Sequence, residues 1–172
     1  MKILLMGFMG CGKSTIGKLI SAKHSMDYID LDEWIEKKEK KSIAEIFERK
    51  GEIYFRKAER KYLKKILKKD NIVIAAGGGT PCYSNNINLI NENAVSFYLK
   101  VPAVKLYERL SQKKFLENRP LLKNFSTKKE LLNFIKTKKT EREKFYLMAD
   151  YTIRTVEMDE QEIAAEIISY VR

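Results

Sequence analysis

The sequence contains few of the residues that build disulfide frameworks or metal clusters. Its 172 residues include two cysteines, Cys11 and Cys82, and a single histidine, His24. No metal-ligand spacing is present, and Cys11 lies in a glycine-rich turn where a disulfide would obstruct a ligand. This cysteine usage fits a reducing compartment, and we expect a cytoplasmic protein.

Long apolar runs are also missing. The N-terminal run at residues 3–6 gives way at once to a glycine-rich stretch, so it is too short for a signal peptide. No other run approaches the length of a membrane span, and we expect no membrane contact. With 44% hydrophobic and 33% charged residues, the composition predicts one globular domain over residues 1–172.

Negative charge is scarce relative to positive charge. The 34 lysines and arginines exceed the 23 aspartates and glutamates, which gives a formal net charge of +11. An excess of this size is found in nucleic-acid-binding proteins, among others. The lysines, however, are spread as pairs along predicted helices, at residues 37–38, 64–65, 68–69, 113–114, 128–129 and 138–139. We interpret most of them as solvated helix faces that attract small anions, and we expect no nucleic-acid partner.

Strand-like and helix-like segments alternate along the chain. Short apolar runs predict strands at residues 2–6, 28–30, 71–76, 94–100 and 151–155. Amphipathic segments predict helices at residues 13–24, 32–40, 42–50, 53–68, 84–93 and 127–148, with others after Pro102 and after Asp159. This alternation predicts an α/β fold with a parallel sheet covered by helices on both faces.

Local signals mark several boundaries between these segments. Residues 111–124 are polar, basic and interrupted by Pro120, which predicts a long mobile loop. Gly51 predicts a helix stop or a tight turn. Three pairs have the spacing of a capping box at a helix start, namely Ser42 with Glu45, Thr127 with Glu130 and Asp159 with Glu162.

The most informative stretch is Gly7-Phe8-Met9-Gly10-Cys11-Gly12-Lys13-Ser14-Thr15, which matches the pattern GxxxxGK[ST]. Its glycines let the backbone turn N–H groups toward an anion, and the following helix adds its positive dipole end. Lys13 can reach the outer phosphates of a nucleotide, and the Ser14 hydroxyl can ligate Mg²⁺. Because a predicted strand precedes it and a predicted helix follows, we favour a phosphate-binding loop over an incidental glycine turn.

Three predicted strands end in residues that carry chemistry, and in an open parallel sheet the site lies beyond those ends. The first ends in the phosphate loop, the second in Asp30-Leu31-Asp32 and the third in Gly77-Gly78-Gly79. One aspartate can hold Mg²⁺ through water and the other can accept a proton, the alternative being an ordinary helix N-cap. The glycines permit unusual dihedrals and offer N–H groups to a ligand, the alternative being a sharp turn into Thr80-Pro81.

Three arginines are candidates for contacts with anionic groups. Arg56 and Arg142 lie in predicted helices, where an arginine taken singly is most often a surface residue. Arg119 lies in the predicted mobile loop, within Arg119-Pro120-Leu121-Leu122. A cation on a closing loop suits the charge that develops on a transferred phosphoryl group.

Taken together and in order, these motifs resemble those of the bacterial shikimate kinases, small P-loop kinases of aromatic amino-acid (chorismate) biosynthesis. The resemblance covers nearly the whole chain and includes Phe55-Arg56 and Arg142 with Tyr146. It implies a three-layer α/β/α P-loop NTPase fold with a five-stranded parallel sheet in the order 2-3-1-4-5. It also implies a substrate-binding helical region at about residues 32–61 and a lid at about residues 111–124.

The same resemblance implies the reaction, which is phosphorylation of the 3-hydroxyl of shikimate by MgATP in a monomeric enzyme. Catalytic roles would fall to Lys13, Asp32 and Arg119. Nucleotide contacts would come from Gly10, Cys11, Gly12, Lys13, Ser14, Thr15, Arg109 and Arg119, and Mg²⁺ contacts from Ser14 and Asp30. Shikimate contacts would come from Asp32, Arg56, Gly77, Gly78, Gly79 and Arg142. The chain departs from the family pattern in a longer segment between Arg109 and Arg119 and in lacking the usual adenine-side loop at residues 155–158.

Two other functions remain open from the residues alone. A small P-loop kinase can act on another polyol acid, such as gluconate, or on a nucleotide. A basic, nucleotide-regulated binding module would bind ATP without transferring a phosphoryl group to any small acceptor. A panel of acceptor substrates separates these functions from phosphorylation of shikimate.

Overall fold

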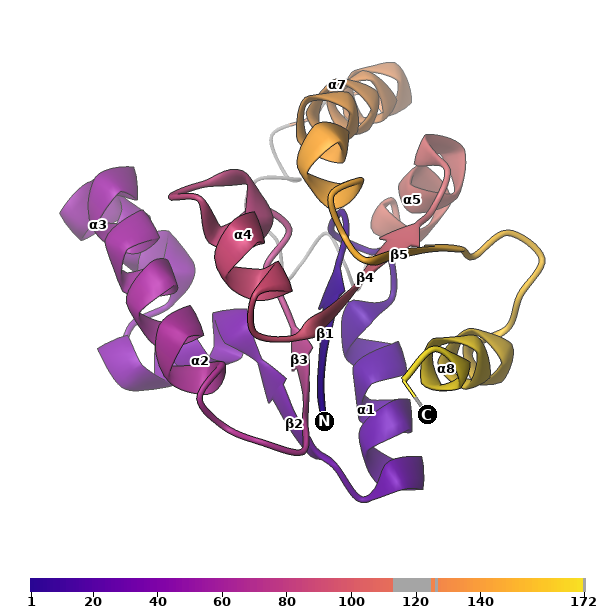
Figure 1. Ribbon diagram of the computed structural model, residues 1–172. Helices are drawn as coiled ribbons and strands as arrows, with labels where there is room; N and C mark the ends of the chain where they lie inside the picture. Colours follow the sequence, from indigo (N-terminus) through magenta and orange to yellow (C-terminus); the bar gives the residue numbers. More distant parts are fainter. Residues whose placement is uncertain (113–124, 126, 172) are drawn as a thin grey trace.

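The core of the structure, a computed structural model that describes residues 1–112, 125 and 127–171, is a five-stranded sheet (Figure 1). The strands are β1 (Lys2–Met6), β2 (Asp27–Asp30), β3 (Ile72–Ala75), β4 (Val95–Lys100) and β5 (Tyr151–Arg154). All neighbouring strands are parallel, and their order is β2-β3-β1-β4-β5. This confirms the predicted α/β class and the strand order implied by the family resemblance.

Helices cover both faces of the sheet, because its strands are apolar on both sides. Ile3 and Leu5 of β1 point into one core cluster, which α1 (Lys13–His24) and α8 (Glu160–Ser169) cover. Leu4 and Met6 point into the other, which α2 (Leu31–Glu39), α3 (Ile43–Ile66) and α4 (Asn86–Asn91) cover. Figure 1 shows these two groups of helices on opposite sides of the strands.

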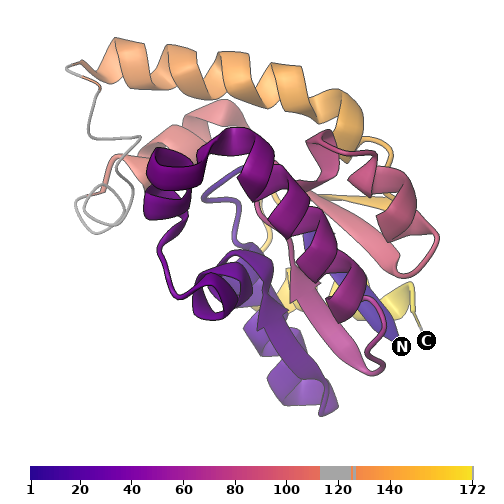
Figure 2. The same cartoon turned by 90° about the vertical axis from the view of Figure 1, so that its left-hand side faces the viewer.

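The remaining helices, α5 (Ala103–Leu110) and α7 (Lys128–Tyr146), pack against each other beyond the carboxyl end of the sheet. Figure 2 shows α7 running across the molecule above α5. Leu131 and Ile135 in the first half of α7 join the core cluster of α1, whereas Tyr146 at its end joins the cluster of α3. The last turn of α7 therefore lies close to the elements on the α3 side. None of the helices in the described part of the chain is long and apolar enough to cross a membrane.

Most helix boundaries predicted from local sequence signals agree with the structure, and a few differ. All three predicted capping boxes are present, at Ser42, Thr127 and Asp159. The helix predicted over residues 84–93 is shorter, because Ser84 and Asn85 both adopt left-handed backbone angles (φ 53° and 54°). The helices predicted over residues 42–50 and 53–68 form one element, α3, that continues across a kink.

The kink in α3 is at Gly51, where the sequence predicted a stop or turn. Its backbone angles are φ 78° and ψ 171°, far from helical values and in a region that residues with a Cβ strongly avoid. A Cβ built there would meet no atom within 4 Å, so the requirement for glycine comes from the backbone alone. The part of α3 after the kink carries Arg56, whose guanidinium lies near Gly79, beyond the carboxyl end of β3.

Replacing Gly51 with alanine should therefore strain the kink without causing a clash. We expect Gly51→Ala to lower the free energy of unfolding by about 1–3 kcal/mol, the scale of one disfavoured backbone conformation. Urea unfolding measures this loss, and Lys57→Ala, at an exposed helical position of the same element, is the control. An unchanged unfolding midpoint for Gly51→Ala would show that the kink is not required.

Candidate active site

The candidate site is formed where β1, β2 and β3 end. In the sheet register, Ala75 of β3 pairs with Leu5 of β1 on one side and with Asp30 of β2 on the other. The segments that follow these three strands therefore begin at the same level of the sheet. The phosphate loop, the paired aspartates and the triple glycine are brought together, as the strand-end pattern predicted.

The phosphate loop has the backbone that its glycines suggested. Gly7, Gly10 and Gly12 have positive φ angles of 143°, 79° and 101°, and Gly12 is the N-cap of α1. At Gly7 a Cβ would lie 2.9 Å from the Leu99 carbonyl oxygen, so a side chain is excluded there. Lys13 Nζ donates to the carbonyls of Gly7 (2.9 Å) and Phe8 (3.1 Å), which holds the ammonium group across the loop.

Asp30 serves as a helix cap and also as the partner of Ser14. Its Oδ1 accepts the backbone N–H groups of Asp32 (3.0 Å) and Glu33 (3.4 Å) at the start of α2. Its Oδ2 accepts the Ser14 hydroxyl at 2.9 Å. One side chain can therefore cap α2 and also place a carboxylate oxygen beside Ser14, so the capping role does not exclude a role in Mg²⁺ binding. A hydroxyl beside a carboxylate is a donor set suited to Mg²⁺, which takes few protein ligands and keeps several waters.

Asp32 is the second residue of α2 and faces the triple glycine. A Cβ at Gly77 would lie only 2.5 Å from Asp32 Oδ1, so the two are in close contact. Burial above all, together with the carboxylates of Asp30 and Glu59, raises the pKa of Asp32 to about 7, whereas Lys13 opposes the shift. A carboxyl group with a pKa near neutrality can exchange a proton with a substrate hydroxyl at physiological pH.

The triple glycine is restricted by space, most strictly at Gly77, and not by positive φ angles. None of Gly77, Gly78 and Gly79 has a positive φ, so that part of the sequence-based expectation is wrong. Each position instead meets a different neighbour where a Cβ would project. At Gly78 the neighbours are Met9 N (3.4 Å) and Arg142 Nη1 (3.5 Å), and at Gly79 they are Arg56 Nη1 and Nη2 (3.2 and 3.3 Å).

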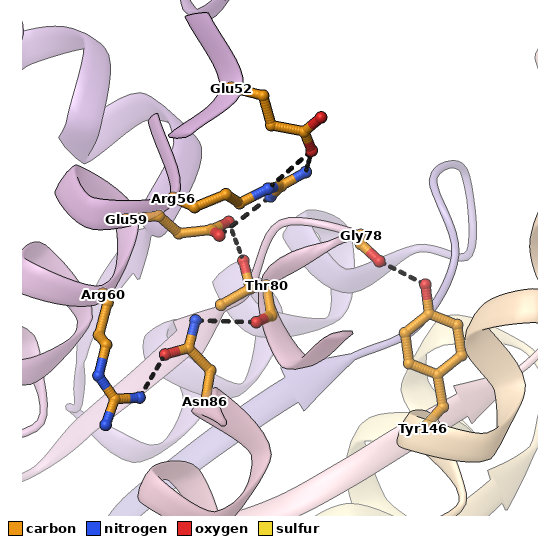
Figure 3. Close-up of polar contacts among 8 residues, drawn as sticks. All are labelled: Glu52, Arg56, Glu59, Arg60, Gly78, Thr80, Asn86 and Tyr146. Atoms are coloured by element: carbon orange, nitrogen blue, oxygen red, sulfur yellow. Dashed lines mark hydrogen bonds and ion pairs between the residues drawn. The ribbon is translucent and has the colours of Figure 1, made fainter. Parts of the chain in front are cut away.

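Arg56 is held by carboxylates from its own helix (Figure 3). Nη1 donates to Glu59 at 3.0 Å, and both Nε and Nη2 donate to Glu52 at 3.2 and 3.1 Å. Its guanidinium also lies 3.7 Å from the centre of the Tyr83 ring. Five N–H groups are available on a guanidinium, so these contacts leave donors for a further anion.

Glu59 is a site residue that the sequence analysis missed. Its side chain is 1% exposed, and besides Arg56 it accepts the Thr80 hydroxyl at 2.7 Å. Thr80 is fixed in turn because its carbonyl accepts Asn86 Nδ2 at 2.9 Å. Glu59 therefore ties Arg56 to the segment after the triple glycine (Figure 3). The spacing of Arg56 and Glu59, three residues apart on a helix, was the signal that could have revealed the pair.

Two other predicted arginines lie beside the phosphate loop. Arg142 of α7 lies 5.7 Å from the centre of the Phe8 ring, between this loop and Gly78. Arg109 of α5 donates to the Gly10 carbonyl at 3.3 Å. Arg119 and most of the predicted lid fall outside the described residues. Cys11 is buried in the loop at 3% exposure, whereas Thr15 is exposed on the first turn of α1.

A parallel sheet in this order, a phosphate loop after β1 and carboxylates after β2 define a kinase of the P-loop class. A shikimate kinase family model matches residues 9–172. The shikimate kinase of Flavobacterium psychrophilum is 40% identical over 168 residues, covering 96% of both chains. That of Persephonella marina is 39% identical over 170 residues, covering 99% of this chain and 98% of the relative.

Solved structures agree with these relatives. The shikimate kinase of Bacteroides thetaiotaomicron superposes with a TM-score of 0.88 at 34% identity, covering 98% of this chain and 95% of that one. The shikimate kinase of Acinetobacter baumannii in complex with shikimate gives a TM-score of 0.84 at 29% identity, covering 99% and 92%. The chain therefore belongs to the shikimate kinase family.

The pKa of Asp32 has a consequence for the stability of the ligand-free, metal-free protein. A carboxyl whose pKa is raised by folding keeps its proton in the folded state while the unfolded state loses it. Asp32 should therefore lower the free energy of unfolding as the pH rises from about 4 to about 7. Asparagine cannot ionise, so Asp32→Asn should gain stability relative to the parent over this window and then level off.

Urea unfolding of both proteins at intervals between pH 4.5 and about 8, with a chelator present, measures this difference. All other groups titrate in both proteins, so subtracting the two curves isolates Asp32 and its neighbours Asp30, Glu36, Glu59 and Lys13. A difference that does not change with pH would contradict the raised pKa.

Proposed function

We propose that this protein transfers the γ-phosphoryl group of MgATP to the 3-hydroxyl of shikimate. The observation that carries the proposal is the convergence of Asp32, Arg56 and Arg142 on one triple glycine beside the phosphate loop. A loop for phosphates, a carboxylate near neutrality and two guanidinium groups match an acceptor that carries both a hydroxyl and a carboxylate. The relatives named above are shikimate kinases, which supports this choice of acceptor.

The nucleotide side of the proposed site is the phosphate loop. Residues 10–15 would surround the phosphates with backbone N–H groups, and Lys13 would leave the carbonyls of the loop to contact the outer phosphates. Ser14 and Asp30 would hold Mg²⁺, directly or through water, and the ion would supply charge neutralisation at the phosphates. Arg109, which already contacts the loop at Gly10, would lie on the nucleotide side.

The acceptor side of the proposed site surrounds the triple glycine. Arg142 lies near Gly78 and Arg56 near Gly79, and both would bind the carboxylate of shikimate, because a guanidinium fork matches a planar carboxylate. The N–H groups of Gly77, Gly78 and Gly79 would donate to acceptor oxygens. Asp32 would orient the 3-hydroxyl and accept its proton, which its pKa near 7 allows.

Phosphoryl transfer depends on positioning and on charge stabilisation, so we expect direct in-line transfer without a phosphoenzyme. Lys13 and Arg119 would stabilise the charge on the transferred group, Arg119 from the lid at about residues 111–124. Closure of that lid over the helical region at about residues 32–61 would exclude water.

We further propose that the protein acts as a cytoplasmic monomer without nucleic-acid or membrane partners. Two free cysteines, one of them inside the phosphate loop, suit a reducing compartment. Many of the lysines that produce the net charge are exposed on helices, as expected for solvated faces.

An acceptor panel tests the proposed reaction. ADP release should depend on shikimate and should stay at the background rate with gluconate or nucleoside monophosphates. Lys13→Ala should abolish release while the protein remains folded, because Lys13 faces the loop and not the core. Turnover that favours one of the other acceptors, or ATP binding with no transfer to any of them, would reject the proposal.

The carboxylate contact makes a separate prediction for Arg56. An ammonium group cannot reproduce the guanidinium fork, so Arg56→Lys should not be conservative. We expect kcat/KM for shikimate to fall by a factor that corresponds to a loss of ~1.5–3 kcal/mol in transition-state stabilisation, the scale of a hydrogen bond to a charged group. The affinity for MgATP should barely change. The matched control is Arg49→Lys, since Arg49 is exposed on the same helix and contacts Glu45 only at 4.0 Å.

A shikimate analogue with a neutral hydroxymethyl group in place of the carboxylate completes this test. It should be a poor substrate for the parent. When Arg56 is changed, kcat/KM for this analogue should fall by a smaller factor than kcat/KM for shikimate. Equal losses for both acceptors would mean that Arg56 acts on the fold or on the nucleotide.

A further inference from the structure

We infer that Tyr146 is a positioning residue for the acceptor site: its hydroxyl fixes the peptide group between Gly78 and Gly79 and so directs the Gly79 N–H at the acceptor. This inference deepens the proposed function and rests on it, because the acceptor is the ligand that the N–H would meet. It assigns a role to the tyrosine that follows Arg142 by one helical turn on α7.

The contact itself links two distant parts of the chain. The Tyr146 hydroxyl donates to the Gly78 carbonyl at 2.5 Å across 68 residues of sequence (Figure 3). The side chain is fully buried, and its ring packs against Tyr98 at 5.1 Å between centroids. Burial raises the pKa of the Tyr146 hydroxyl, so the group keeps its proton and remains a donor.

The carbonyls of the triple-glycine segment are all engaged by the protein. The Gly77 oxygen accepts Thr80 N at 3.0 Å, the Gly79 oxygen accepts Cys82 N at 2.9 Å, and the Thr80 oxygen accepts Asn86 Nδ2. Tyr146 supplies the remaining contact, at Gly78. By contrast, the N–H groups of Gly77, Gly78 and Gly79 have no acceptor within the described ranges of the chain. This segment therefore presents donors without protein partners, which suits a ligand rich in oxygen.

Peptide geometry connects the Tyr146 contact to one of those donors. The Gly78 carbonyl and the Gly79 N–H belong to the same planar trans peptide, so they point in opposite directions. In Figure 3 the Gly78 carbonyl points to Tyr146 and away from Arg56. The Gly79 N–H consequently points away from Tyr146, toward the side where Arg56 lies 3.2 Å from the Cβ position of Gly79.

This peptide needs an anchor because it lies between two glycines. Without Cβ atoms on either side, the peptide can rotate at little steric cost and exchange its N–H for its carbonyl oxygen. A carbonyl turned into the site would repel the carboxylate or the hydroxyl oxygens of the acceptor. Tyr146 and Arg142, four residues apart on one helix, both reach Gly78, so α7 orients the peptide and an arginine together.

Tyr146→Phe tests the role of the hydroxyl, because phenylalanine preserves the packing of the ring. We expect KM for shikimate to rise about tenfold, the scale of one buried hydrogen bond, with a smaller change in kcat and no change in KM for MgATP. Tyr62→Phe is the matched control, since it removes another buried hydroxyl contact, to Glu39 at 2.9 Å, far from the triple glycine. That variant should leave KM for shikimate unchanged.

A set of acceptor analogues distinguishes positioning from a general structural effect. If the Gly79 N–H binds one acceptor oxygen, the analogue that lacks this oxygen should be insensitive to Tyr146→Phe, whereas shikimate and the other analogues lose affinity. The set consists of the hydroxymethyl analogue and the single deoxy analogues, each measured at a temperature where thermal unfolding shows the variant to be folded.

Three results would overturn the inference: an unchanged KM for shikimate, an equal rise of KM for shikimate and MgATP, or equal losses across all analogues. Failure of the parent to turn over shikimate would instead reject the proposed function. The two failures are therefore distinguishable.

Discussion

The position of β3 between β1 and β2 is the constraint on which the site depends. Adjacent strands are about 4.8 Å apart, so the segments that follow three neighbouring parallel strands start within the reach of one small ligand. The common register at Ala75 places the end of β3 level with Leu5 and Asp30. A phosphate loop, a pair of aspartates and a glycine turn that are far apart in sequence become one site for this reason.

Close packing around the triple glycine is a second constraint, and it determines which neighbours the site has. A Cβ at Gly77 would displace Asp32, and one at Gly79 would meet Arg56. At Gly78 the neighbouring atoms belong to the phosphate loop and to Arg142. At Gly77 and Gly79, functional groups thus occupy the space that a side chain would need. The glycines allow a carboxylate and two guanidinium groups to approach one stretch of backbone.

Much of this arrangement was predictable from the sequence, because its signals are local. The alternation of apolar runs predicts a parallel sheet, and the capping boxes at Ser42, Thr127 and Asp159 mark helix starts that the structure confirms. The kink at Gly51 was also marked by its glycine. Strand order, in contrast, depends on contacts between distant segments, and it was available only through the family resemblance.

The parts that sequence analysis missed depend on burial and on long-range contacts. A triple glycine in a sequence does not show why glycine is needed there. Either unusual backbone dihedrals or a lack of space for a side chain can require it. Glu59 had a local signal in its spacing from Arg56, yet only its burial shows that it joins that arginine to Thr80. The hydrogen bond from Tyr146 to Gly78 has no signal in either segment, because the two residues meet only after the sheet and α7 are in place.

The charges of the site and those of the surface act at different ranges. Within the site, Arg56 is paired with Glu52 and Glu59, and the charge of Lys13 acts on Asp32 by lowering its pKa. This pairing makes a carboxylate as buried as Glu59 tolerable, since its oxygens are satisfied by Arg56 and Thr80. The net charge of +11 is carried largely by exposed lysines, as on the outer face of α3 at Lys57, Lys61 and Lys64. Their field is screened over about 10 Å at moderate salt, whereas contacts between partly buried groups are screened much less. Salt should therefore act on the rate at which anionic substrates reach the site and only weakly on the orientation of groups within it.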